Sequence, residues 1–169
     1  MQPLTADQIR SSFVNTTVRE TRQAGMPDLE QTDWDRREYL GWQDSTRPQL
    51  SYVVIPMDDG PVGLMLRTQP PSPNRRRMMC AWCQDITLSD PAVLYVARRA
   101  GTAGRRGDSV GTAICADFGC SRIVRRMPSI TEMSGGSDEE KQWFIDRRIQ
   151  ELGERTRGFV REVLGETTA

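Results

Sequence analysis

The chain contains no histidine, and this absence excludes a large group of catalytic mechanisms. None of its 169 residues can supply the imidazole of a Ser-His or Cys-His pair, of a zinc-protease motif or of a general base near neutral pH. Carboxylates remain, in conspicuous clusters at Asp33, Asp35, Asp58 and Asp59. Acidic pairs in loops and turns are usually solvated turn formers. We therefore expect a protein that is not an enzyme and has no small-molecule substrate.

The sequence also lacks long apolar runs and a leader segment. No stretch approaches the roughly 20 apolar residues that a membrane helix needs. The start of the chain, Met1 to Arg10, holds neither a basic leader nor an apolar run, so no secretory signal is visible. With 37% apolar residues and no net charge, the 169 residues are long enough for one ordinary domain. We expect a single domain over residues 1–169 that is cytoplasmic and has no membrane partner.

Four cysteines are present, spaced as Cys80-x2-Cys83 and Cys115-x4-Cys120. Zn²⁺ takes four soft ligands at tetrahedral corners, and a two-residue gap lets a tight turn aim two sulfurs at one point. Four thiolates leave no open position, so the sequence predicts one structural Zn²⁺ without a catalytic role. Disulfides, a redox Cys-x-x-Cys and an iron-sulfur cluster are less favoured alternatives, on grounds of compartment and spacing.

The second cysteine pair needs a different backbone from the first. On a helix with 3.6 residues per turn, side chains five residues apart point about 140° away from each other. We therefore expect Cys115 to end a strand and Cys120 to lie in the first turn of a helix. Asp117 is a suitable N-cap, which would make Cys120 the third helical position. A thiolate there lies near the positive end of the helix dipole, which favours its metal-binding form.

Cap signals predict helices at the two ends of the chain. The capping box Thr5-x-x-Gln8 opens an N-terminal helical segment, residues 5–24, and Ser137-x-x-Glu140 opens a long C-terminal helix, residues 137–165. Apolar residues recur at helical spacing in the second of these segments, so one face of this helix is expected to pack against the rest of the protein.

The middle of the chain, residues 39–126, has the pattern of a sheet. Four runs have the composition and length of strands: Leu50–Met57, Val62–Arg67, Ala92–Val96 and Val110–Ile114. Asp58-Asp59-Gly60 between the first two is a hairpin signal. The glycine- and arginine-rich stretch Ala100–Asp108 is predicted to be a mobile loop. The sequence therefore predicts an α+β fold, with a small mixed or antiparallel sheet that carries the zinc finger between the two helical segments.

Charge is unevenly distributed along the chain. Residues 67–126 carry 11 basic and 4 acidic side chains, whereas residues 1–66 carry 6 and 10, and residues 127–169 carry 6 and 9. The cysteine-containing segment is therefore the basic one, and the acidic flanks could fold back and neutralise it. The residues we expect to bind a partner are Trp82, Phe118, Arg122, Arg125, Arg126, Arg75, Arg76 and Arg77, because arginine and aromatic side chains contribute much interface energy.

An alternative role for these residues stays open. Large apolar side chains are usually buried, so Trp82 and Phe118 could instead cover the zinc site. The arginines would then form a solvated face that offsets the negative charge of four thiolates around Zn²⁺.

Five segments, in their order and spacing, resemble a known family: Ile9–Asn15, Leu40–Trp42, Tyr52–Val54, Cys80–Cys83 and Gly111–Ser121. The chain resembles the elongation-factor-G-binding proteins with a C-terminal treble-clef zinc finger, a family that is related to fusidic-acid-resistance proteins and includes short actinobacterial chains. The resemblance implies a treble-clef finger in a small mixed sheet, with both cysteine pairs as zinc ligands. It also implies binding to translational elongation factor G, helping the factor to leave a stalled ribosome.

Two classes of partner therefore remain open. An adaptor would grip elongation factor G at or near the ribosome through the zinc finger. Alternatively, the arginine clusters would bind ribosomal RNA or another nucleic acid directly, since guanidinium groups suit phosphate. Binding to several phosphates weakens steeply as salt rises, whereas a largely apolar protein interface changes little.

Overall fold

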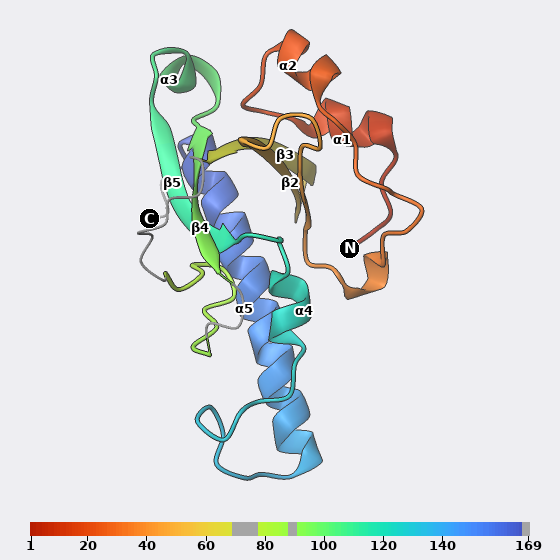
Figure 1. Ribbon diagram of the computed structural model, residues 1–169, viewed down its shortest axis with the longest axis vertical. Coiled ribbons are helices and arrows are strands. Elements are labelled where there is room, and N and C mark those ends of the chain that lie inside the picture. The colour runs from red at the N-terminus through yellow and green to blue at the C-terminus, as the bar shows by residue number, and fades with distance from the viewer. Residues whose placement is uncertain (69–77, 88–90, 167–169) are drawn as a thin grey trace.

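An antiparallel sheet organises the computed structural model, which describes residues 1–68, 78–87 and 91–166 (Figure 1). Its five strands are β1 Leu40–Gln43, β2 Leu50–Met57, β3 Gly60–Thr68, β4 Ala92–Arg98 and β5 Ser109–Cys115. They lie in the order of the chain, and each is antiparallel to its neighbour, which makes the sheet a meander. The α+β prediction is confirmed, with an antiparallel sheet.

The β2–β3 and β4–β5 connections differ. Met57 pairs with Gly60 across the predicted Asp58-Asp59 turn, and Gly60 has a φ of 123° that favours glycine. Between β4 and β5, the prediction of a mobile loop at residues 100–108 is wrong, because α3 Gly101–Arg105 forms there. Gly104 explains the difference: a Cβ there would lie 1.8 Å from the carbonyl oxygen of Arg99, so glycine permits this tight packing.

Helices flank the sheet in sequence as predicted. The N-terminal segment forms α1 Ala6–Ser12 and α2 Val18–Gln23, each opened by a threonine capping box. A single 3-10 turn, η1 Trp34–Arg36, precedes β1. A short helix, α4 Cys120–Val124, follows β5, and α5 Asp138–Leu164 begins at the predicted Ser137 capping box. Gly165 ends α5 in the left-handed conformation.

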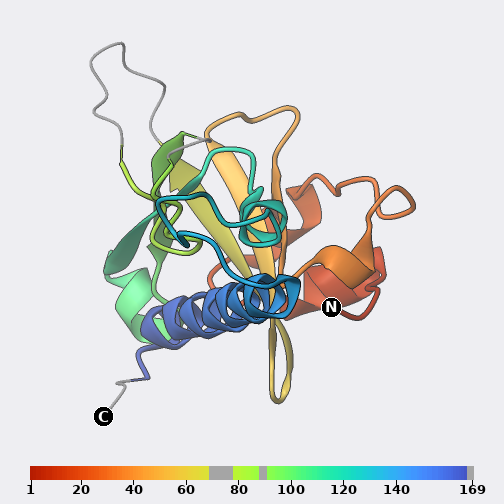
Figure 2. The ribbon, with the colours of Figure 1, turned by 90° about the horizontal axis from the view of Figure 1, so that it is seen from below.

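Both faces of the central strands are buried, so β2 is an apolar run without alternation. Val53 and Ile55 face a core shared with Leu152 and Val160 of α5 and with the four cysteines. The alternate residues of the strand, including Tyr52, face the N-terminal helices. Figure 2 shows α5 and the N-terminal helices on different sides of the strands.

The helix α5 is longer than the sheet that it covers. Its apolar side chains near the C-terminal end pack against the core, while its N-terminal half runs past α4 beyond the sheet (Figure 1). Contacts with α4 stabilise this half. Although α5 has 27 residues, neither it nor any other helix in the described part of the chain is apolar enough to cross a membrane.

Candidate metal centre

The first cysteine pair lies in a tight turn fastened to the sheet. The Cys83 N–H donates to Cys80 Sγ at 3.5 Å, and the Gln84 N–H donates to the Cys80 carbonyl at 3.0 Å. Gln84 is left-handed, with a φ of 51°. The Ala81 N–H donates to the carbonyl of Ala113 in β5 at 2.8 Å, which holds this turn beside the second cysteine pair.

The second pair joins a strand to a helix, as predicted: Cys115 ends β5, and Cys120 lies in the first turn of α4. The prediction of Asp117 as the N-cap is wrong, because the N-cap is Gly119 and Cys120 is the first helical residue. Phe118 has a φ of 56°, which turns the chain between Asp117 and the helix. The Asp117 carboxylate instead accepts from the N–H of Gly119 at 2.8 Å, closing the turn rather than the helix.

The four sulfurs have the spacing of a tetrahedral metal site. They all lie within 4.8 Å of one another, and the pairs Cys80–Cys120 and Cys83–Cys115 have Sγ–Sγ distances of 3.6 Å. Zn–S bonds of about 2.3 Å at tetrahedral angles place sulfurs about 3.8 Å apart. A disulfide requires about 2.05 Å, so the cysteines are not bridged. All four side chains are buried, leaving no open side for a substrate.

The charge of the four-cysteine cluster also favours a bound cation. Hydrogen bonds from Cys115 and Cys120 lower the pKa of Cys80, whereas hydrogen bonds with Cys120 and Cys80 raise the pKa of Cys115 far above its usual value. Four adjacent thiolates would repel one another strongly in this buried position. A dication between the sulfurs removes the repulsion and keeps coordinating thiols deprotonated, so the donor set fits Zn²⁺.

Comparison with known protein families identifies the type of this site. The family described as FBP C-terminal treble-clef zinc-finger matches residues 8–163, which is nearly the whole chain. The chain belongs to this family. No curated protein and no solved structure matches the chain. The treble-clef finger consists here of the Cys80–Cys83 turn, the end of β5 and α4, and its four cysteines form the site of one structural Zn²⁺.

The two aromatic residues predicted to bind a partner lie in the core of the treble-clef finger. Trp82 is 1% exposed and Phe118 is 3% exposed, so neither side chain is available on the surface. The Trp82 ring packs against Tyr39 and Phe159, with centroids 4.9 and 5.9 Å away. The prediction of an exposed aromatic patch is therefore wrong, and the alternative that these rings cover the zinc site describes the structure.

Two of the predicted arginines are occupied by internal ion pairs. Arg125 forms a two-pronged pair with Glu38, with distances of 2.7 and 2.6 Å. Arg126 contacts Asp85 and Glu132, each at 2.7 Å. Burial raises the pKa of Glu132, but hydrogen bonds from Arg126 and Ser129 outweigh this effect and lower the pKa to about 2. Acidic residues from both flanks therefore neutralise this part of the basic segment.

The remaining predicted arginines differ in position. Arg122 is exposed on α4 and donates to Asp117 at 2.8 Å. The predictions for Arg75, Arg76 and Arg77 lie outside the described residues.

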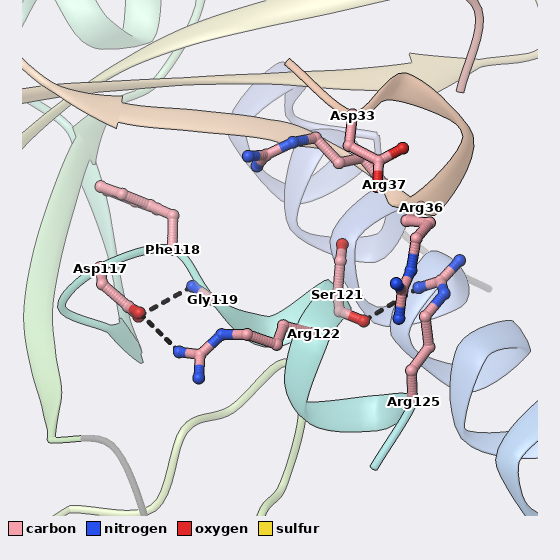
Figure 3. Close-up of a pocket in the computed structure, with 9 residues that line it drawn as sticks. All are labelled: Asp33, Arg36, Arg37, Asp117, Phe118, Gly119, Ser121, Arg122 and Arg125. Atoms are coloured by element: carbon pink, nitrogen blue, oxygen red, sulfur yellow. Dashed lines mark hydrogen bonds and ion pairs between the residues drawn. The ribbon is translucent and has the colours of Figure 1, made fainter. Parts of the chain in front are cut away.

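A second group of arginines was missed in the sequence. Arg36 and Arg37 join Arg122 and Arg125 around one cavity (Figure 3). The only local signal is a pair of consecutive arginines within an acidic stretch, and it does not indicate that η1 folds against α4.

Proposed function

We propose that the protein is a zinc-stabilised adaptor that binds translational elongation factor G at or near the ribosome and aids its release. Support comes from the five segments that resemble elongation-factor-G-binding proteins and from membership of the treble-clef family. The buried four-sulfur site supports a role in which zinc maintains the shape of a binding surface, because it offers no open coordination position for chemistry.

The observation that carries the proposal is a group of exposed apolar side chains around the finger. We call this group the finger-tip surface, and its members with their exposed fractions are Met79 51%, Ile86 54%, Met127 60% and Ile130 86%. The four side chains belong to the segment of the Cys80–Cys83 turn and the segment after α4, which the Arg126–Asp85 ion pair joins. Neighbouring exposed apolar side chains are typical of protein interaction sites. The surface therefore replaces the buried Trp82 and Phe118 as the expected contact region for a protein partner.

Ion pairs hold the finger-tip surface in place before any partner binds. The contact between Arg126 and Asp85 ties the segment after α4 to the cysteine turn, next to Met127 and Ile86. Glu132 accepts from the backbone N–H of Ser129 at 2.8 Å, which restrains the neighbouring Ile130. A surface that is already ordered loses less conformational entropy on binding, which favours affinity.

Binding of the nuclease-treated protein to purified elongation factor G tests the proposal. The double variant Ile86→Asn with Ile130→Asn removes two apolar side chains from the surface. We expect at least about a tenfold rise in Kd, which corresponds to a combined loss of about 1.4 kcal/mol from two residues at the centre of the contact. The control Val18→Asn changes an equally exposed apolar residue on α2, 71% exposed, and is expected to leave Kd unchanged.

Isothermal titration calorimetry at low and moderate salt supplies the measurement. Binding that survives nuclease treatment and changes little with salt supports a protein interface. Failure of the unaltered protein to bind the factor contradicts the proposal, as does a double variant with the affinity of the control.

A further inference from the structure

A cavity of about 420 Å³ lies between the η1 segment and α4. Its lining residues are Asp33, Arg36, Arg37, Asp117, Phe118, Gly119, Ser121, Arg122 and Arg125 (Figure 3). This volume falls within the range of about 300–1,000 Å³ that is typical of ligand sites. We call it the arginine pocket.

The arginine pocket has an excess of positive charge. Four guanidinium groups face two lining carboxylates, and Glu38 behind the wall is paired with Arg125. Within the described part of the chain, the side chains of Arg36 and Arg37 make no hydrogen bond or ion pair, although each guanidinium carries five N–H donors. These two groups are therefore available to an anion from outside.

The direction of the side chains favours a tetrahedral anion. Figure 3 shows Arg36 and Arg37 leaving the η1 wall in different directions, with Arg36 directed toward Arg125 and Arg37 toward the other side of the pocket, while Arg122 is directed toward Asp117. A carboxylate has two oxygens in one plane and is satisfied by one guanidinium fork, whereas a phosphate offers oxygens in several directions. Guanidinium groups that point in different directions therefore suit the phosphates of a strand better than a single carboxylate.

The carboxylate of Asp33 points to a ligand that also donates hydrogen bonds. Asp33 makes no side-chain hydrogen bond to the η1 backbone that it precedes. Its carboxylate can accept from a hydroxyl, and the 2′-hydroxyl of ribose is such a donor next to a phosphate. The ionised side chains of an acidic peptide would instead bring only acceptors toward this aspartate.

We propose that the arginine pocket binds a ribonucleotide phosphate presented by an RNA strand. Arg36 and Arg37 contact phosphate oxygens of the strand, and Asp33 accepts a hydrogen bond from a 2′-hydroxyl beside them. The residues of this site are distinct from Met79, Ile86, Met127 and Ile130, so RNA binding is independent of the proposed contact with elongation factor G. An adaptor with both surfaces could contact a protein factor and RNA at the same time.

The variant Arg36→Gln with Arg37→Gln tests this site by fluorescence anisotropy with a labelled single-stranded RNA oligonucleotide. We expect Kd to rise about tenfold or more, because the variant cannot make the charged hydrogen bonds to the phosphate. The slope of log K against log salt should also become shallower by about 0.7 for each phosphate that the variant no longer neutralises. The matched control Arg19→Gln with Arg22→Gln makes the same charge change on exposed residues of α2 and should retain the affinity and slope of the unaltered protein.

Competing ligands distinguish the source of the phosphate and the class of partner. Competition by free AMP that depends on Arg36 and Arg37 supports the site with a free nucleotide as its ligand, whereas competition by RNA alone supports a strand. Weaker binding of DNA with the same base order, and loss of this preference in Asp33→Asn, supports the hydroxyl contact.

Two results overturn the proposal. One is equal loss of RNA affinity in the arginine-pocket variant and in the α2 control. The other is binding of a glutamate-rich peptide that depends on Arg36 and Arg37 and that RNA does not displace. Binding of elongation factor G by the arginine-pocket variant, measured alongside, separates failure here from failure of the adaptor function.

Discussion

Side chains near the sheet show how neighbours set the ionisation of a single residue. Asp44 is 2% exposed and accepts from the Tyr52 hydroxyl at 3.0 Å and from Arg47 at 2.8 Å. Burial raises its pKa, but these hydrogen bonds dominate and hold the pKa of Asp44 well below its usual value. Burial, and then the Asp44 carboxylate, raises the pKa of Tyr52 to about 12. The phenol is therefore held protonated as a donor.

A prediction for alkaline pH follows from Tyr52. The pKa of Tyr52 is higher in the folded protein than the value near 10 of an unfolded chain. The stabilisation that Tyr52 gives to the folded state is therefore fully present below pH about 10 and is lost as the pH rises to about 12. Tyr52→Phe should cost about 1 kcal/mol at pH 8, because phenylalanine cannot donate the hydrogen bond to Asp44. The stability gap between the two proteins should shrink between pH about 10 and about 12 in urea unfolding with excess zinc. A gap that does not change over this range contradicts the assigned role.

Among the elements, α5 links the zinc finger to the sheet although its composition is not ideal for a helix. Gly153 and Gly158 lie in its interior, where glycine costs conformational entropy. Gly158 has space around it, since a Cβ there would meet nothing within 4 Å. Gly165 at the end of α5 has a φ of 81° and is required by the left-handed cap.

One substitution should therefore have opposite effects at two positions of the same helix. Gly158→Ala should raise the free energy of unfolding by about 0.5–1 kcal/mol, because the unfolded chain loses freedom and the folded helix gains a better former. Gly165→Ala should lower it by about 1 kcal/mol, since alanine is strained at positive φ. Urea titration of both variants measures the change in the free energy of unfolding. A change of the same sign at both positions would refute the explanation.

At the scale of the whole molecule, the zinc site connects segments that are distant in the chain. The Cys80–Cys83 turn bonds to β5 through Ala81, and Trp82 packs on Tyr39 before β1 and on Phe159 of α5. Cys120 adds α4 to the same centre. Because these contacts belong to the main core, we expect zinc to stabilise the sheet and α5 as well as the finger.

Removal of zinc should therefore unfold the protein. Structural zinc contributes on the order of 10 kcal/mol in small fingers, which is comparable to the total stability of a domain. Native mass spectrometry should show one zinc per chain, and Cys80→Ser or a chelator should abolish the cooperative unfolding transition seen by circular dichroism. Met79→Ser, a change at the exposed neighbour, should retain both zinc and the transition. A metal-free protein that keeps this transition would contradict the structural role.

Features that depend on nearby residues were predictable from the sequence. The capping boxes at Thr5 and Ser137, the hairpin around Gly60 and the strand-to-helix placement of Cys115 and Cys120 all follow from local backbone preferences. The same local reasoning failed at Asp117, where the left-handed Phe118 separates the carboxylate from the helix. It also failed at residues 100–108, where glycines allow close packing instead of mobility.

The sequence by itself determined that this protein has a closed four-cysteine zinc centre, because absent histidine and cysteine spacing leave few other ligand sets. Only the tertiary structure decided which side chains face a partner. Arg125 is neutralised by Glu38, 87 residues earlier in the chain, and Trp82 is covered by α5. Conversely, η1 and α4 bring Arg36 and Arg122 to one cavity. Charge pairing and burial act between segments that meet only after folding, so local spacing does not reveal them.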